Sequence, residues 1–177
     1  VEPFYRELNV PEKLLAQKPK PGSIISEKLI EEIDATEFIL SNGVRLIYKQ
    51  TDLDENNILL SGFRKGGYYS LQEEDYVSGI YSTPIISLSG YGEFSREALS
   101  QFLAGNSAKA TMLADKTRTG FYASSDLEDK KTLFELLYLK WTSPKLDTDL
   151  FTQVKERTME SKQEEDLSPS QLFGKEI

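Results

Sequence analysis

The side chains in this chain that could do chemistry are carboxylates, hydroxyls and lysines, because the sequence contains neither histidine nor cysteine. Imidazole is the commonest ligand of catalytic zinc and the usual general base near neutral pH. Its absence excludes Ser-His-Asp and Cys-His catalysis and every histidine-based metal site. The absence of cysteine also excludes disulfides and thiolate metal sites. The candidates that remain are two acidic clusters and a group of tyrosines.

The two acidic clusters have simple structural interpretations. Asp52, Asp54 and Glu55 follow a predicted strand, but their loop lacks the glycine and the distant glutamate of an EF-hand. We therefore interpret it as an acidic loop rather than a calcium site. The run Glu73–Asp75 could form a general acid and base pair, yet it also begins a predicted helix, where the helix dipole favours negative charge. We interpret this run as a helix start.

Five tyrosines could line a groove for a peptide. A tyrosine combines apolar area with a hydrogen-bonding tip, which suits a binding surface and also the rim of a core. We favour the core and rim interpretation. The residues are Tyr68, Tyr69, Tyr76, Tyr81 and Tyr91.

The charge balance narrows the classes of partner. The chain has 21 Lys and Arg against 29 Asp and Glu, which gives a formal net charge of −8. A surface that binds nucleic acid needs clustered positive charge, and so does docking on an anionic membrane. We therefore expect neither nucleic acid nor membrane as a partner. The sequence also contains no apolar run of the roughly 20 residues that would span a bilayer.

The elements that must position these residues fall into two predicted parts. Residues 1–33 contain four of the seven prolines and read as a linker or strap, with residues 24–33 as a short helix or an extended lead-in. Residues 34–177 read as an α+β domain of the order β-β-β-α-α-β-β-α-α. This order predicts a two-layer sandwich, a mainly antiparallel sheet with helices on one face. The expected strands are 37–40, 44–50, 57–63, 108–113 and 119–124, and the expected helices are 74–88, one after Ser95, one capped by Ser125 or Asp126, and one from Asp147 or Thr148.

The order and spacing of these segments resemble a known family. The stretches are FILSNGVRLIYKQTDLDENNILLSGFRKGG, DYVSGIYSTPIISLSGYGEFS, LSQFLAGNSAKATMLADKTRTGFYASS and DLEDKKTLFELLYLKWTSPKLDTDLFTQVK. Together they cover about residues 20–160. They are similar to the insulinase/pitrilysin zinc metallopeptidases, and more narrowly to the second half of the bacterial zinc-protease-like members. The leading KPKPG stretch resembles the linker between the two halves.

The resemblance implies a clamshell of homologous domains, one of which carries H-x-x-E-H on a helix. In that motif two histidines bind zinc and the glutamate activates water. Carried onto this chain, the equivalent helix is 74–88, and the three chemical positions fall on Gly79, Ser82 and Thr83. None of these offers an imidazole or a carboxylate. The resemblance thus implies a domain with no catalytic residue, no metal ligand and no cofactor of its own.

The function that this implies is a non-catalytic domain that encloses substrate in a zinc-dependent peptidase acting on peptides or small proteins. Its expected partners are the catalytic half of the same longer chain, which would hold the zinc, and a peptide substrate. We expect the longer protein to be bacterial and periplasmic or secreted, and we expect this chain to be a piece that continues at its C-terminal side. A truncated domain exposes apolar surface, so self-association is a further expectation. The alternative is a catalytically silent assembly or scaffold subunit of the same fold.

Overall fold

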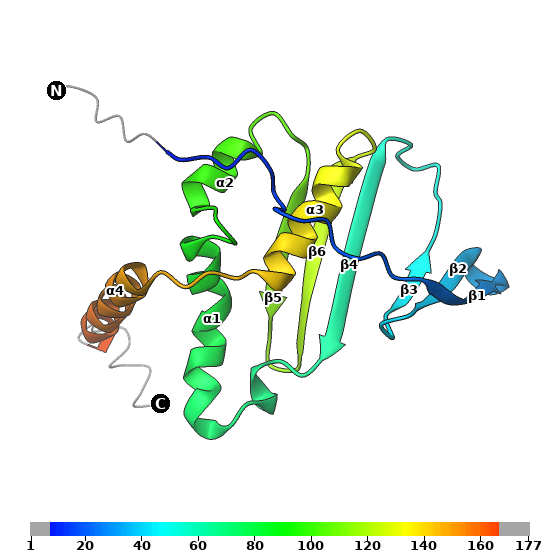
Figure 1. Cartoon of the computed structure of the whole chain (residues 1–177). Helices are drawn as coiled ribbons and strands as arrows, with labels where there is room; N and C mark the ends of the chain where they lie inside the picture. The colour runs from blue at the N-terminus through cyan, green and yellow to red at the C-terminus, as the bar shows by residue number, and fades with distance from the viewer. Residues whose placement is uncertain (1–7, 167–177) are drawn as a thin grey trace. The chain divides into compact units, whose positions relative to one another are not determined.

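The computed structural model describes residues 8–166, with side chains described as far as residue 161 (Figure 1). The chain forms two compact units. One is Leu15–Asn57, and the other combines Val1–Leu14 with Ile58–Ile177. Each unit has its own three-stranded sheet, so the fold is α+β with antiparallel strands, as predicted from the sequence. The assignment of residues 1–33 to a linker between two halves remains a prediction.

The smaller unit is an antiparallel sheet of order β1-β2-β3. Its turn at Asn42-Gly43 is a true hairpin turn, because the Gly43 N–H donates to the Leu40 oxygen over 2.8 Å and Gly43 has a φ of 83°. Such a positive φ favours glycine. The strands are β1 (Ile24–Ile30), β2 (Ala35–Leu40) and β3 (Arg45–Tyr48), with a short 3₁₀ turn at Glu31–Ile33.

Strand β1 corrects the expected element order. Of the two alternatives for this segment, residues 24–30 are extended and not helical, and they form a paired strand, with Glu27 opposite Phe38 and Leu29 opposite Thr36. The element order therefore begins with four strands and not three. The strands also do not form the single sheet that we expected, since β4 (Asn57–Lys65) joins a second sheet, that of the larger unit.

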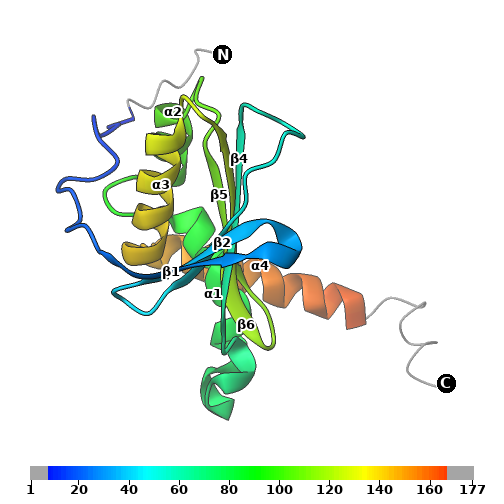
Figure 2. The same cartoon turned by 90° about the vertical axis from the view of Figure 1, so that its right-hand side faces the viewer.

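The larger unit contains the sheet of order β4-β6-β5, with β6 in the middle. Helix α3 packs on β5 and β6, and helix α1 packs on β5. Figure 2 shows this sheet nearly edge-on, with α2 and α3 on one side, which is the two-layer arrangement predicted from the sequence. The elements are β5 (Lys109–Ala114), β6 (Arg118–Asp126), α1 (Tyr76–Ser89), α2 (Arg96–Phe102), α3 (Lys130–Thr142) and α4 (Thr148–Asp166).

The core of the larger unit lies between its helices and its sheet. Leu133, Leu136 and Leu139 of α3 recur at helical spacing and are all buried, with exposed fractions of 4% or less. Fully burying a leucine is worth about 1.5–3 kcal/mol, so this stripe anchors α3 to the sheet. Leu14 is also buried, so the N-terminal arm is tied to this unit at that point rather than being a free strap. No helix within residues 8–166 has the length and apolar character needed to cross a membrane.

Helix ends in this unit follow ordinary capping chemistry, with one correction. Ser95 caps α2 as predicted, because its Oγ accepts from the Ala98 N–H over 3.1 Å. The cap expected at Ser125 or Asp126 is wrong. Strand β6 continues through Asp126, and Asp129 occupies the N-cap position of α3.

Candidate functional site

Helix α1 occupies the place that the sequence resemblance assigns to a metal-binding helix. Its start is marked by a 3₁₀ turn at Glu73–Asp75, which gathers three carboxylates at the positive end of the helix dipole. Its end is set by Gly90, whose φ is 103° and whose N–H donates to the Ile86 oxygen. Ile85 is buried, and the helix contacts β5, α2 and α4. The helix is therefore firmly placed in the unit.

The first of the three aligned positions is packed against the preceding loop. A Cβ added at Gly79 would lie 2.5 Å from Cδ1 of Leu71 and 2.7 Å from Cβ of Tyr68. Carbon atoms that are not bonded do not approach so closely, and the Cβ of Tyr68 is fixed to its backbone. Gly79 thus lets α1 lie against the Tyr68–Leu71 segment, and the volume that an imidazole would need there is already filled.

The other two aligned positions offer hydroxyl groups. The Oγ of Ser82 donates to the Gly79 backbone oxygen over 2.8 Å, and both Ser82 and Thr83 are half-buried. A serine bonded to its own helix in this way has its proton engaged locally. Catalytic zinc takes about three protein ligands and a water molecule. Gly79, Ser82 and Thr83 supply no histidine, cysteine or carboxylate toward such a set.

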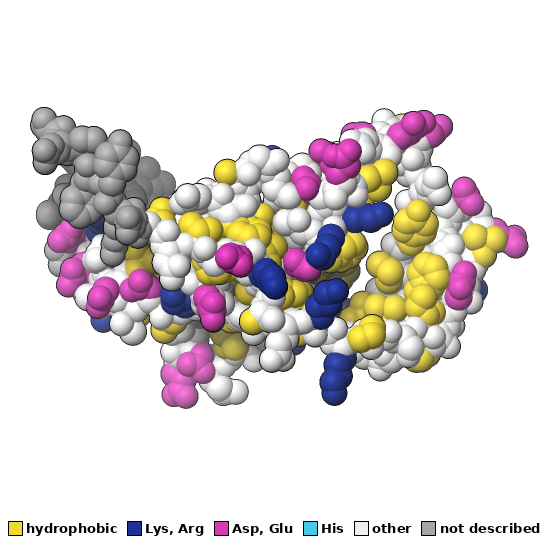
Figure 3. Space-filling view, turned by 45° about the horizontal axis from the view of Figure 1, so that its top comes forward, with side chains coloured by type: hydrophobic (Ala, Val, Ile, Leu, Met, Phe, Trp, Pro, Cys, Tyr) yellow, Lys and Arg dark blue, Asp and Glu magenta, His cyan; other side chains and the backbone are white. Residues whose placement is uncertain are grey.

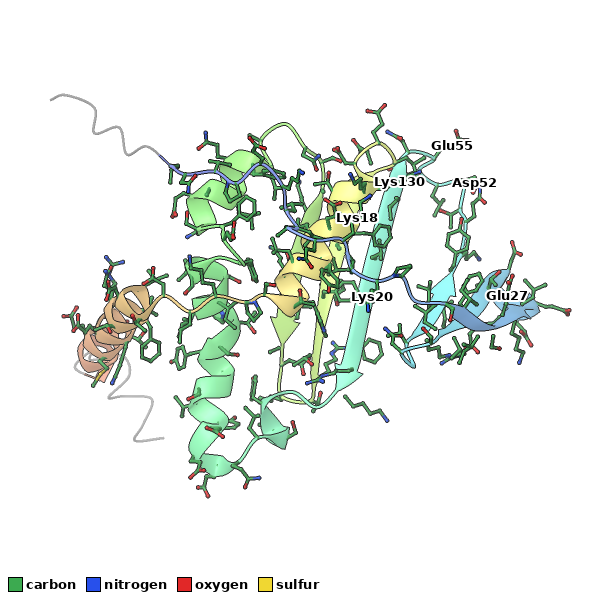
Figure 4. All side chains as sticks on the ribbon, in the orientation of Figure 1. Lys18, Lys20, Glu27, Asp52, Glu55 and Lys130 are labelled. Atoms are coloured by element: carbon green, nitrogen blue, oxygen red, sulfur yellow. The ribbon has the colours of Figure 1, made fainter. Side chains whose placement is uncertain are left out.

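The acidic cluster of Asp52, Asp54 and Glu55 lies in the loop before β4, where Asp54 makes local hydrogen bonds. Asp54 accepts from the backbone N–H of Asn56 over 3.3 Å and from the Asn57 side chain over 3.4 Å, and so stabilises the loop before β4. Asp52 and Glu55 lie on the same connection (Figure 4). Across the described part of the chain, no three acidic side chains gather closely enough to hold a metal ion.

Three of the five tyrosines form a cluster beside the start of α1. Tyr68 packs edge-on against Tyr69 and Tyr76, and the rings of Tyr69 and Tyr76 stack with centroids 5.8 Å apart. Burial, followed by the neighbouring Tyr69, raises the pKa of Tyr76. The Lys116 ammonium lies 5.8 Å from the centre of the Tyr69 ring, and the Tyr69 side chain raises the pKa of that lysine. This cluster packs the start of α1 against the β5–β6 turn.

The structure does not bring all five tyrosines together. Tyr91 is buried, with an exposed fraction of 3%, and its ring faces the Lys140 ammonium 5.1 Å away. The Lys140 Nζ also donates to the Ala110 oxygen of β5 over 2.6 Å, and burial lowers the pKa of Lys140. Tyr91 therefore serves the helix–sheet packing, and the core and rim interpretation holds for it.

One surface was missed by sequence reasoning, namely the face of the sheet that the helices do not cover. Two neighbouring hollows of about 260 and 510 Å³ lie on it, and Ser61 and Tyr122 line both. Leu59 and Phe63 of β4 are 80% and 73% exposed there, unusually high for large apolar residues in a strand. The alternation of Leu59, Ser61 and Phe63 is the sequence signal that predicts one shared face. We call this surface, lined by Leu59, Ser61, Phe63, Thr111, Leu113, Arg118, Gly120 and Tyr122, the open face.

Close packing of β4 on β6 involves a glycine on each face of the sheet. On the open face, a Cβ added at Gly120 would lie 2.2 Å from the Gly62 oxygen and 3.1 Å from Phe63 Cα. On the face that α3 covers, a Cβ added at Gly62 would lie 2.5 Å from the ring of Phe121, which packs against Trp141. Figure 3 shows that apolar side chains reach the surface at several places with lysines and arginines near them.

Comparison with known proteins finds no family model that matches the chain, but it finds related zinc proteases. The chain is 36% identical over 98 residues to the zinc protease PQQL-like of Arabidopsis thaliana, covering 55% of the chain and 10% of that protein. It is 32% identical over 118 residues to the probable zinc protease PqqL of Haemophilus influenzae, covering 65% of the chain and 13% of that protein.

Two solved structures share the fold. The periplasmic protease PqqL of Escherichia coli matches with a TM-score of 0.79 and 20% identity, over 93% of this chain and 18% of that one. A mutant of the ferredoxin protease FusC, solved in complex with Arabidopsis ferredoxin, matches with a TM-score of 0.83 and 16% identity, over 98% of this chain and 19% of that one. The chain thus spans less than a fifth of the length of these relatives.

Proposed function

The chain is homologous to a segment of the PqqL-type zinc proteases, which confirms the resemblance to the insulinase/pitrilysin metallopeptidases; from this premise we propose that it is a non-catalytic domain that encloses substrate in a longer zinc-dependent peptidase. In this proposal the H-x-x-E-H motif and the zinc belong to an upstream domain of the same protein. This domain belongs to the second half of the longer protein and closes over a bound peptide or small protein. Its partner is then the catalytic half of its own chain.

The observation that carries the proposal is the packing at Gly79. The helix that would hold the metal instead presses a glycine against Tyr68 and Leu71, and Ser82 bonds back to Gly79. A domain of this fold still contributes to catalysis without a reactive group, because excluding water and holding a peptide in place lower the barrier of the reaction. Enclosure also restricts substrates to chains that fit the enclosed space.

The experiment that tests the proposal uses the full-length protein and this chain side by side. We expect zinc and peptidase activity in the full-length protein, and neither in the 177-residue chain. In the full-length protein, Ser82→Ala and Thr83→Val should leave the zinc content and kcat within about twofold, because these groups hold no metal. A loss of zinc on either substitution would contradict the proposal, since it would make α1 a metal-binding helix.

The alternative is a catalytically silent assembly or scaffold subunit of the same fold. The absence of metal ligands on α1 agrees with both functions, so the discriminating feature lies outside this chain. A full-length protein that lacks H-x-x-E-H and binds no zinc would favour the scaffold. A full-length protein that has the motif and cleaves peptides would favour the peptidase.

We further propose a periplasmic or secreted location for the longer protein. The support is the likeness of fold to a PqqL that is described as periplasmic. Fractionation of cells that express the full-length protein tests this location. Recovery of the protein in the cytosolic fraction alone would refute it.

A further inference from the structure

Helix α1 has an unusual composition for a helix at the surface of a domain. None of its 14 residues, Tyr76–Ser89, is charged, and apolar side chains lie on both its inner and its outer side. A helix that is apolar on every side is normally enclosed by protein, because a side that faces solvent carries polar and charged residues. Here only the side with Ile85 and Ser89 is buried. The outer side of α1 therefore has the composition of an interface.

Three apolar residues follow one another along that outer side. Val77, Ile80 and Pro84 are spaced three and four residues apart, which places them on one side of a helix. Val77 is 61% exposed, Ile80 is 39% exposed, and Pro84 is exposed as well. Because proline has no N–H, the helical hydrogen bond to the Ile80 oxygen is not made. These three residues, which we call the α1 stripe, combine apolar area with a backbone acceptor that lacks its helical donor.

The surroundings of the α1 stripe are acidic. Glu73–Asp75 places three carboxylates just before Val77, and none of them forms a salt bridge with another residue of the described part of the chain. Lys116, which lies over the Tyr69 ring beside this turn, offsets only part of their charge. Helix α4 contacts α1 and carries more acidic than basic residues. A complementary partner is therefore apolar at its centre and basic around it.

Two other occupants fit the α1 stripe less well. A second copy of this surface would bring the same carboxylates together, which is unfavourable. The small unit Leu15–Asn57 is joined to the larger unit at Leu14 and at the start of β4, whereas α1 packs on β5, the opposite edge strand of the sheet. By contrast, this chain spans less than a fifth of the length of its relatives, so most of such a protein is chain that the structure does not contain.

We propose that the α1 stripe binds an amphipathic helix from another part of the longer protein, a helix with one apolar side flanked by lysines or arginines. Its apolar side packs on Val77 and Ile80 as ridges of one helix pack into grooves of another. Its cations meet Glu73–Asp75, and one of them donates to the Ile80 oxygen. This inference rests on the proposed place of the chain within a longer peptidase, and it adds the surface and the chemistry of that contact.

The test compares the reactivity of single cysteines, which suits this chain because it contains none of its own. Val77→Cys places a thiol on the α1 stripe, and Ile85→Cys places one on the buried side of the same helix. Lys130→Cys places one at the exposed start of α3 (Figure 4). Labelling with N-ethylmaleimide is followed by mass spectrometry of the peptide that contains the substitution, so cysteines elsewhere in the full-length protein do not interfere.

In the 177-residue chain, the thiol at position 77 should react about as fast as the thiol at position 130. In the full-length protein it should react about tenfold or more slowly, approaching the thiol at position 85, because a covered group reacts only when its contact opens. The thiol at position 130 should change less than about twofold between the two proteins. Ile80→Cys repeats the measurement at a second position of the α1 stripe.

Charge reversal tests the chemistry of the partner. In the full-length protein that carries Val77→Cys, Glu74→Lys should raise the labelling rate about two- to fivefold, because it removes an attraction of the size of an exposed ion pair. Glu128→Lys, in the exposed turn before α3, is the matched control and should leave the rate within about twofold. Zinc content and peptidase activity of the same samples show that each variant is folded.

Three results would overturn the assignment. Equal labelling rates at position 77 in the two proteins would leave the α1 stripe uncovered. Slow labelling at position 77 in the 177-residue chain itself would give the stripe to a second copy if dilution speeds the reaction, and to Leu15–Asn57 if it does not. An unchanged or lower rate with Glu74→Lys would exclude a basic partner.

The same samples separate this inference from the proposed function. If position 77 stays reactive while the full-length protein binds zinc and cleaves peptides, only the assignment of the α1 stripe fails. If the unsubstituted full-length protein has neither zinc nor peptidase activity, the proposed function fails, and the labelling rates still decide whether the stripe is covered.

Discussion

Substituting Gly79 by alanine tests the packing on which the functional argument depends. At an open helix position this change stabilises a protein by about 1 kcal/mol, because alanine loses less backbone entropy on folding and favours the helix. Here the new methyl group would lie 2.5 Å from Leu71 and 2.7 Å from the Cβ of Tyr68. The tip of Leu71 can rotate, but Tyr68 Cβ moves only with its backbone. Overpacking of this kind costs about 1–3 kcal/mol.

The two effects oppose each other, so the net change in the free energy of unfolding is a loss of about 0–2 kcal/mol instead of a gain of about 1. Trp141 is the only tryptophan of the chain and packs edge-on against Phe121 in the same unit as Gly79. Its fluorescence during urea unfolding therefore reports on the relevant unit. The neighbouring Ser78→Ala, at an exposed position of α1, is the control and should stabilise by no more than about 0.5 kcal/mol.

A stabilising Gly79→Ala would refute the reasoning. It would mean that α1 has room at the position aligned with the first histidine, and that the lack of a metal site reflects residue identity alone. Gly79→His extends the same test, because an imidazole is larger than a methyl group. It should destabilise more than Gly79→Ala does.

Three other predictions concern metal, pH and association. Adding EDTA or zinc should leave the Tm of the 177-residue chain unchanged, because a ligand stabilises only a protein that binds it, and a shift of several degrees would reveal a site. The hydrogen bond from the Thr117 N–H is the largest of several causes that lower the pKa of the Asp115 carboxyl from 3.8 to about 2. The ionised carboxylate therefore stabilises the folded protein fully above about pH 4, and this stabilisation is lost as the pH falls toward 2. Asp115→Asn should flatten the fall of Tm in that range, and an unchanged profile would contradict this. Leu46 lies opposite Phe38 on an exposed apolar face of the small sheet, so Leu46→Lys should reduce self-association in sedimentation runs more than Ile47→Lys on the other face does.

Local signals in the sequence predicted several elements well. The Asn42-Gly43 dipeptide predicted a hairpin, and the positive φ of Gly43 is the physical reason. Ser95 predicted the start of α2, because a serine oxygen satisfies an otherwise unpaired helix N–H. In each case the energy that fixes the structure comes from residues within four positions of one another. Such patterns can be read from the sequence directly.

The errors arose where distant residues decide the structure. Strand β1 is fixed by pairing with β2, and its own run of apolar and charged residues has no clear alternation. The start of α3 is displaced because of Ser107, which precedes β5 in the sequence and is thus separated from α3 by two strands. Ser107 accepts a hydrogen bond from the Asp126 N–H and donates to Asp129. These bonds also lower the pKa of Asp129. No pattern within α3 itself could predict a cap chosen by a residue 22 positions away.

Pro84 lies inside α1. A proline within a helix removes one hydrogen bond and usually kinks or divides the helix. The helix α1 instead continues through Pro84, which lies on its exposed side, where the Ile80 carbonyl that would have accepted the bond can be hydrated. The result is an uninterrupted helix of 14 residues, with Gly79 packed against Leu71 and Tyr68. A continuous packed helix without metal ligands agrees with the substrate-enclosing role that we propose.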